Sequence, residues 1–167
     1  MSALIIALCH NYFEFAEKLI SHNVDKNNII HALHASFRFA NQREIVSFLL
    51  SQGANVNSVD SNGMTVLMNA VKYATPDGIT DLIQAGADVH AEGPDGTTAM
   101  SVALNMFEKF ARRYRIETHY IEIMRCLVEA GADAKTTSEN GSTTALGAAW
   151  RANREDLAQF FIDHGAY

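Results

Sequence analysis

A short phrase, Gly-Ala followed by one or two polar or small residues, recurs along the chain at nearly constant spacing. It begins at Gly53, Gly86, Gly131 and, at the end of the chain, Gly165, and the interval between the second and third copies is longer than the other two. A degraded copy begins at Asn23, nearly one period before the first full one. A fixed period of this kind indicates a repeat architecture, in which each unit buries its apolar face against its neighbours. We therefore expect a stack of about five similar units with one insertion.

A second phrase lies in register with the first. Thr65 and Thr144 precede the next glycine of the first phrase by the same interval, and Thr98 precedes its own glycine by a longer one. Each threonine is followed by apolar residues at helical spacing, as in Thr65-Val-Leu-Met-Asn-Ala. A threonine hydroxyl placed there can cap the free backbone N–H groups of a helix. Each unit is therefore expected to begin its first helix at this phrase, which starts at His31 in the second unit.

The two phrases together resemble those of ankyrin repeats, whose signature is Thr-Pro-Leu-His-x-Ala. His34 matches the signature histidine, and no copy carries the signature proline. The resemblance implies an all-α solenoid of stacked helix-turn-helix pairs with β-hairpin fingers, in one domain over residues 1–167. The repeats would cover approximately residues 1–27, 28–59, 60–92, 93–138 and 139–167.

Glycines also indicate where the second helix of each unit ends and where the fingers turn. The glycine of the first phrase is expected to take the left-handed conformation that is costly for residues with a Cβ atom. Between the units, turn residues ending in Gly63, Gly96 and Gly141 predict tight hairpins. Asn27 and His31 are close together in the sequence, so the first junction is expected to have no finger.

The fourth unit carries an insertion near residues 104–121, which contains neither glycine nor proline and keeps a helical stagger of apolar residues. The insertion is expected to lengthen both helices of this unit. It also contains a basic cluster of Lys109, Arg112, Arg113 and Arg115. The cluster is either a docking patch for an acidic partner or, as we favour, the solvated face of a long helix.

Composition excludes several classes of function. The net charge of −6 argues against a nucleic-acid-binding protein, because binding phosphates needs an excess of Lys and Arg. Every apolar run is too short to span a membrane. Two cysteines far apart in sequence, Cys9 and Cys126, favour a reducing compartment over a disulfide framework. The expected location is the cytoplasm, or the host cytosol if the chain is a delivered effector.

No sequence motif indicates catalysis. Phosphate-binding loops, nucleophile elbows and paired metal ligands are missing from the sequence. His31 and His34 lack further ligands nearby, and Cys9 and His10 are adjacent in sequence, so their side chains point in different directions on a helix. Cys126 is expected to be a buried, inert thiol. We therefore predict a non-enzymatic protein without a cofactor or metal.

The resemblance implies a protein partner bound by the ends of the first helices and by the finger tips. The corresponding helix positions are Arg38, Phe39, Lys72, Tyr73, Asn105, Met106 and Arg151. The finger positions include Val59, Met64, Glu92, Asp95 and Glu139. Aromatic and Arg side chains supply many hot spots of protein interfaces, which favours this interpretation. In the alternative, Phe39 and Met106 only fill gaps between helices.

Other interpretations stay open from sequence alone. One open interpretation is a scaffold, and another is an effector or inhibitor that acts on a host or cognate protein. Asn57 resembles ankyrin asparagines that a dioxygenase hydroxylates, although a structural role in the turn is the favoured alternative. A monomer is expected, with self-association through the apolar first unit as the weaker possibility. Polar residues of the last helix predict a cap at the other end: Glu155, Asp156, Gln159 and Asp163.

Overall fold

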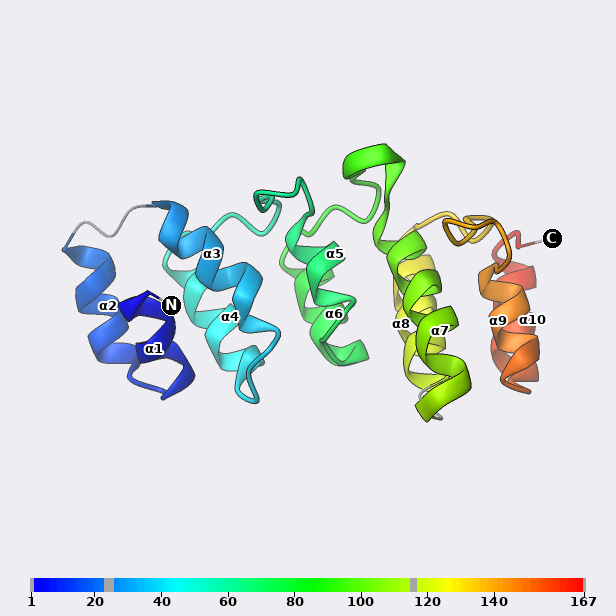
Figure 1. Cartoon of the computed structure of the whole chain (residues 1–167), viewed down its shortest axis with the longest axis horizontal. Helices are drawn as coiled ribbons and strands as arrows, with labels where there is room; N and C mark the ends of the chain where they lie inside the picture. Colours follow the sequence, from blue (N-terminus) through cyan, green and yellow to red (C-terminus); the bar gives the residue numbers. More distant parts are fainter. Residues whose placement is uncertain (1, 23–25, 115–116, 167) are drawn as a thin grey trace.

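The chain folds as a single row of helix pairs (Figure 1). The computed structural model describes residues 2–22, 26–114 and 117–166. Ten α-helices lie within these ranges, and they confirm the expected all-α solenoid. The pairs are α1 (Ala3–Cys9) with α2 (Phe13–Ser21), α3 (Lys26–Ser36) with α4 (Gln42–Ser51), α5 (Val66–Ala70) with α6 (Pro76–Gln84), α7 (Ala99–Tyr114) with α8 (Glu117–Glu129), and α9 (Ala145–Arg151) with α10 (Glu155–Asp163).

Hydroxyl side chains begin the first helices of most pairs. The Thr65 hydroxyl oxygen accepts a hydrogen bond from the backbone N–H of Met68 at 3.2 Å, and Thr144 does the same for Gly147 at 3.1 Å. Ser2 caps α1 in the same way through the backbone N–H of Ile5. These contacts satisfy donors that a helix leaves free at its start. The predicted capping role of the threonines is confirmed.

Left-handed glycines follow the second helices. Gly53, Gly86, Gly131 and Gly165 have φ angles of 83°, 92°, 101° and 90°, as predicted. A residue with a Cβ atom adopts this conformation only at an energetic cost. The glycine therefore turns the chain from each second helix toward the next unit.

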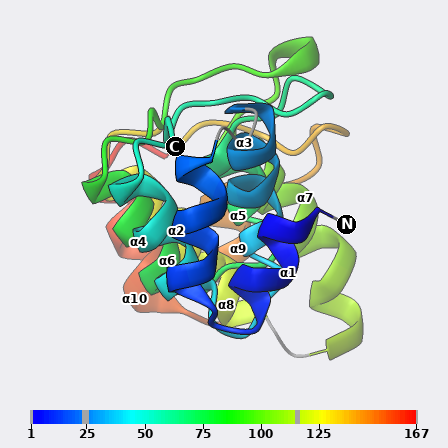
Figure 2. The ribbon, with the colours of Figure 1, turned by 90° about the vertical axis from the view of Figure 1, so that its left-hand side faces the viewer.

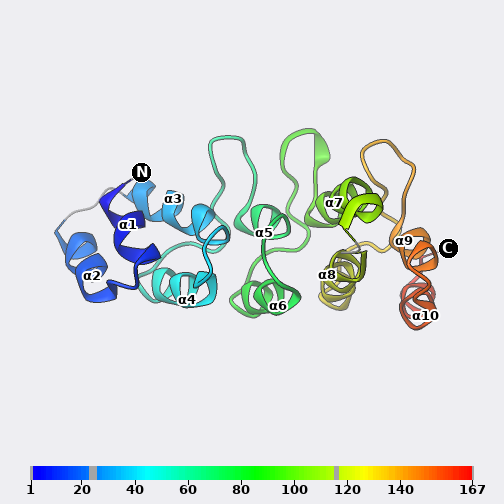
Figure 3. The same cartoon turned by 60° about the horizontal axis from the view of Figure 1, so that its bottom comes forward.

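The helices form two layers (Figure 3). The first helices of the pairs lie in one layer and the second helices in the other, and the connecting loops project beyond the first helices. Buried apolar residues of both layers form one continuous core along the row. The layer of the first helices and the projecting loops therefore share one side of the molecule.

The fingers are mostly irregular loops. Single antiparallel bridges pair Val59 with Thr65 and Thr137 with Thr144. The finger between them contains a 3₁₀ turn, Pro94–Gly96, in which Asp95 has a φ of 56°. In the described ranges, the predicted β-hairpins are thus present as tight turns with at most one bridge each.

The first junction and the insertion account for the two irregular units. Between α2 and α3 there is no space for a finger, as predicted, because α2 ends at Ser21 and α3 begins at Lys26. Helix α3 therefore starts more than one turn before His31, and the expectation that it starts at the signature was wrong. The segment preceding His31 holds no glycine or proline, so the helix extends through it. The insertion lengthens α7 to 16 residues, and α7 extends past the other first helices (Figure 2).

Candidate binding surface

Arg38 and Tyr73 meet on the side of the row that carries the ends of the first helices. The Arg38 guanidinium carbon lies 5.2 Å from the centre of the Tyr73 ring, a cation–π contact. Arg38 follows α3 and Tyr73 follows α5, so the contact joins two neighbouring helix pairs. Both side chains are exposed, and Tyr73 keeps 51% of its surface accessible. The pair presents a flat, charged and aromatic surface to solvent.

The other predicted helix-end residues differ in how far contacts within the chain hold their side chains. Phe39 and Met106 are half-buried and pack against the core, as the gap-filling alternative expected. Lys72 is half-buried and donates a hydrogen bond to the Asn69 side chain at 3.3 Å. Arg151 is exposed, donates to the Thr143 hydroxyl, and lies 5.6 Å from the centre of the Phe107 ring. Partner binding by these four residues stays a prediction.

Asn105 and Glu108 hold the last finger against α7. The Asn105 side-chain oxygen accepts a hydrogen bond from the backbone N–H of Glu139 at 3.0 Å. The Glu108 carboxylate accepts bonds from Ser138 at 2.8 Å, from Asn140 at 3.0 Å and from Ser142. Asn105 therefore positions the finger, and its contact with a partner stays a prediction. Glu108 was not predicted, since only the fold brings residues 138–142 to this earlier helix.

These hydrogen bonds keep Glu108 ionised. Desolvation by burial would raise the pKa of this carboxyl group, but the hydrogen bonds from Ser142 and its neighbours in the finger outweigh it. They lower the pKa of Glu108 from 4.5 to about 2. The carboxylate therefore stabilises the folded state fully above pH 4.5, and this contribution is lost as the pH falls toward 2.

Glu108→Gln is expected to lower the free energy of unfolding by about 1–2 kcal/mol near neutral pH, because charge-assisted hydrogen bonds are lost. Urea unfolding at about pH 6 and about pH 3 measures the difference from the wild type, which shrinks at the lower pH. Glu17→Gln on the exposed face of α2 is the matched control and should have little effect at either pH. A difference that grows at low pH would contradict the assignment.

The finger residues present a mixed surface. Val59 is 53% exposed, and Glu92, Asp95 and Glu139 are at least partly accessible as well. Met64 is half-buried and packs against the core, and its contact with a partner stays a prediction. The finger loops that carry these residues project beyond the layer of the first helices (Figure 3).

A polar chain beneath this surface joins the second and third pairs. The Asn69 side-chain nitrogen donates to Asp60 at 2.9 Å and to Nδ1 of His34 at 3.0 Å. Desolvation by burial lowers the pKa of His34, although the Asp60 carboxylate opposes this effect. A neutral His34 with its proton on Nε2 fits these contacts. Its role is structural, as expected of the signature histidine.

Asn57 connects the turns of two units. Its side-chain nitrogen donates to the carbonyl oxygen of Gly86 at 3.0 Å, and its side-chain oxygen accepts from the backbone N–H of Asp88 at 2.8 Å. Both ends of the side-chain amide are thus bonded to the following turn. These contacts favour the structural interpretation of Asn57, and its hydroxylation stays a prediction.

The basic cluster of the insertion is only partly described. Lys109 is exposed, and its Nζ lies 5.3 Å from the centre of the Phe110 ring. The side chains of Arg112 and Arg113, and all of Arg115, lie outside the described residues. The acidic-partner patch stays a prediction.

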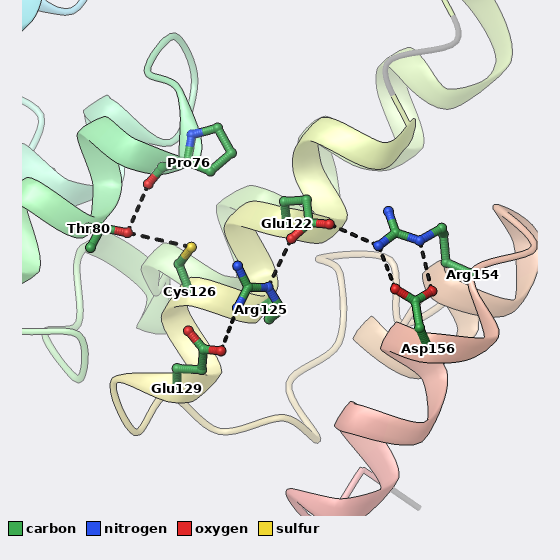
Figure 4. Close-up of polar contacts among 8 residues, drawn as sticks. All are labelled: Pro76, Thr80, Glu122, Arg125, Cys126, Glu129, Arg154 and Asp156. Carbon is green, nitrogen blue, oxygen red and sulfur yellow. Dashed lines mark hydrogen bonds and ion pairs between the residues drawn. The ribbon is translucent and has the colours of Figure 1, made fainter.

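Ion pairs tie the second helices together on the opposite side of the row. Arg154 bonds to Glu122 at 3.0 Å and to Asp156 at 2.6 Å, and Arg125 connects Glu122 to Glu129 (Figure 4). Farther along, Arg43 of α4 pairs with Asp81 of α6 at 2.7 Å. A groove of about 510 Å³ runs beside this last pair. The Arg154–Glu122 and Arg43–Asp81 pairs thus join neighbouring helix pairs on this face.

Reactive and metal-binding side chains do not cluster in the described part of the chain. Cys126 is buried, as predicted, and the Thr80 hydroxyl lies 3.6 Å from its sulfur (Figure 4). Within residues 2–22, 26–114 and 117–166, no three His, Cys, Asp or Glu side chains converge as a metal site requires. None of the described helices has both the length and the apolar character needed to cross a membrane.

Comparisons with known proteins agree with this architecture. A family model described as ankyrin repeats, in three copies, matches residues 4–93 and, in an overlapping match, residues 33–112. Ankyrin repeat and SOCS box protein 6 of Homo sapiens is 26% identical over 181 residues, which cover 99% of this chain and 43% of the relative. The protein of the same name from Pongo abelii gives the same values. The chain thus spans less than half the length of these relatives.

Proposed function

Since the chain belongs to the ankyrin-repeat family, whose members generally mediate protein–protein interactions without catalysis, we propose that it binds a protein partner. The binding surface consists of the ends of the first helices and the finger loops. Its centre is the exposed pair of Arg38 and Tyr73, and its edge is formed by Val59 and the acidic finger residues Glu92, Asp95 and Glu139.

The Arg38–Tyr73 contact is the observation that supports this proposal most strongly. Arg and Tyr are enriched among hot-spot residues because each provides a large contact area together with directional polar groups. Stacking on the ring holds the guanidinium in place before a partner arrives, which reduces the side-chain entropy lost on binding. An acidic side chain of the partner fits over this cation, and an apolar one fits beside Val59.

Affinity capture from a cell lysate tests this surface. The double variant Arg38→Ala and Tyr73→Ala is expected to lose a partner that the wild type retains, with at least about a 30-fold drop in affinity, as hot-spot truncation produces. The retained proteins are identified by mass spectrometry, and the affinity is then measured with the purified partner.

Ser47→Ala on α4, an exposed position on the opposite side of the row, is the matched control and should retain the partner. Far-UV circular dichroism and the thermal midpoint confirm that both variants fold. Equal affinity of the double variant and the wild type would place the interface elsewhere and contradict the proposal.

A further inference from the structure

Basic side chains recur at matching positions along the layer of the first helices. Arg38, Lys72 and Arg151 lie at the same interval after the first residue of the signature phrase in the second, third and fifth units. Asn105 holds this position in the fourth unit, and Lys109 follows it one helical turn later on the same face of α7. Four successive helix pairs therefore contribute one cation each. These residues form the cation row: Arg38, Lys72, Lys109 and Arg151.

The cation row has no acidic counterpart within the described part of the chain. Of the 19 acidic residues of the sequence, only Glu108 lies in a described first helix, and groups of the last finger already bond it. Among the described residues, no member of the cation row forms an ion pair with a carboxylate. On the second-helix side, by contrast, Arg43, Arg125 and Arg154 are all paired. The layer of the first helices is therefore basic in a chain whose net charge is −6.

Contacts within the chain hold these cations in place without neutralising them. Arg38, Lys109 and Arg151 are exposed and lie over aromatic rings, at 5.2, 5.3 and 5.6 Å from the ring centres. Lys72 is half-buried and donates to the Asn69 side-chain oxygen at 3.3 Å. A ligand that binds ordered side chains loses less entropy than one that must order them. The cation row is thus prepared for an acidic ligand.

The stacking of the first helices sets the spacing of the cation row. Helix α3 contacts α5, α5 contacts α7 and α7 contacts α9, and packed helices lie about 8–10 Å apart. A polyproline II segment has three residues per turn and rises about 3.1 Å per residue, so every third side chain points to one side at intervals of about 9 Å. In a β-strand, side chains three residues apart point to opposite faces. A polyproline II segment laid across the first helices therefore matches the spacing.

We propose that the partner presents an acidic polyproline II segment, with Asp or Glu at every third residue, and that its carboxylates lie on successive members of the cation row. This inference rests on the proposed function and specifies the chemistry of the segment that binds. Tyr73, which is 51% exposed beside Arg38, offers an aromatic surface to the residues between the carboxylates, as grooves that bind such segments do. Nucleic acid fits less well, because its uniform negative charge would also meet the acidic finger residues Glu92, Asp95 and Glu139.

Fluorescence anisotropy with two labelled peptides tests the spacing. The periodic peptide is Glu-Pro-Pro repeated four times, and the block peptide has the same composition with its four glutamates together at one end. The two peptides have the same charge and the same proline content, so the order of their residues is the only difference. At low salt, the full chain should bind the periodic peptide about 10-fold more tightly, because the block peptide cannot reach all four cations.

Lys109→Glu tests the cation row outside the Arg38–Tyr73 pair. It should weaken binding of the periodic peptide about 5- to 10-fold, because an attraction is replaced by a repulsion. Lys72→Glu is a second, independent variant with the same expected direction. Lys18→Glu, on the exposed face of α2, makes the same change in net charge away from the cation row and should have little effect. Circular dichroism confirms that the variants fold.

Several outcomes would overturn the acidic segment. They are equal affinity for the two peptides, no measurable binding of the periodic peptide, or an equal loss of binding in Lys18→Glu and Lys109→Glu. An oligothymidylate of similar length that binds as tightly as the periodic peptide would indicate a general polyanion surface instead. The proposed function is judged separately, since a lysate partner that the wild type retains and the Arg38→Ala and Tyr73→Ala variant loses supports it whatever the peptides show.

Discussion

Phe107→Ala is expected to lower the free energy of unfolding by about 3–5 kcal/mol. Phe107 is fully buried in α7, in the longest of the helix pairs. Its removal leaves a cavity that the surrounding helices cannot fill completely, and the Arg151 guanidinium loses the ring beneath it. Denaturant unfolding followed by circular dichroism measures the change.

Phe15→Ala is the matched control, because it removes the same side chain from an exposed position of α2. Its effect should stay within about 0.5 kcal/mol, as surface substitutions do. A loss below about 1 kcal/mol for Phe107→Ala would show that α7 does not form the core described here.

Phe161→Ala is expected to lower the free energy of unfolding of the last pair by a similar amount, about 3–5 kcal/mol. Unlike Phe107→Ala, it is also expected to change how the protein unfolds. Phe161 is fully buried in α10, and the last pair has a neighbour on one side only. In a row where each unit contacts only its neighbours, weakening an end unit uncouples it from the others. The last pair is then expected to unfold at a lower urea concentration than the remaining four.

Trp150 reports this uncoupling directly, because it is the single tryptophan of the chain and lies in α9 of the same pair. In the Phe161→Ala variant, tryptophan fluorescence should change before the circular dichroism signal. In the wild type the two transitions should coincide, as in two-state unfolding. Coincident transitions in the variant would show that the last pair is not a separable unit.

The sequence predicted the architecture well because each unit carries its own signals. The left-handed glycines and the capping threonines act through local backbone chemistry, so their positions could be inferred without tertiary contacts. The missing first finger and the long α7 followed from the spacing alone. The early start of α3 was missed because the signature predicts where a typical unit begins, whereas local helix propensity extended this one.

The contacts that surface side chains form within the chain could not be predicted, because side-chain partners depend on the fold. Asn105 and Arg151 occupy the expected helix ends, yet their hydrogen bonds hold the last finger and Thr143. Glu108 has no sequence signal, since its partners lie in the finger, far along the chain.

Photo-crosslinking at position 73 tests the proposed binding surface most directly. A benzophenone amino acid replaces Tyr73 in one sample and Ser47, on the opposite side of the row, in another, and crosslinked proteins are identified by mass spectrometry. The proposed function predicts a specific partner crosslinked from position 73 and not from position 47. The same partner crosslinked from position 47 alone would contradict it and place binding on the second-helix face.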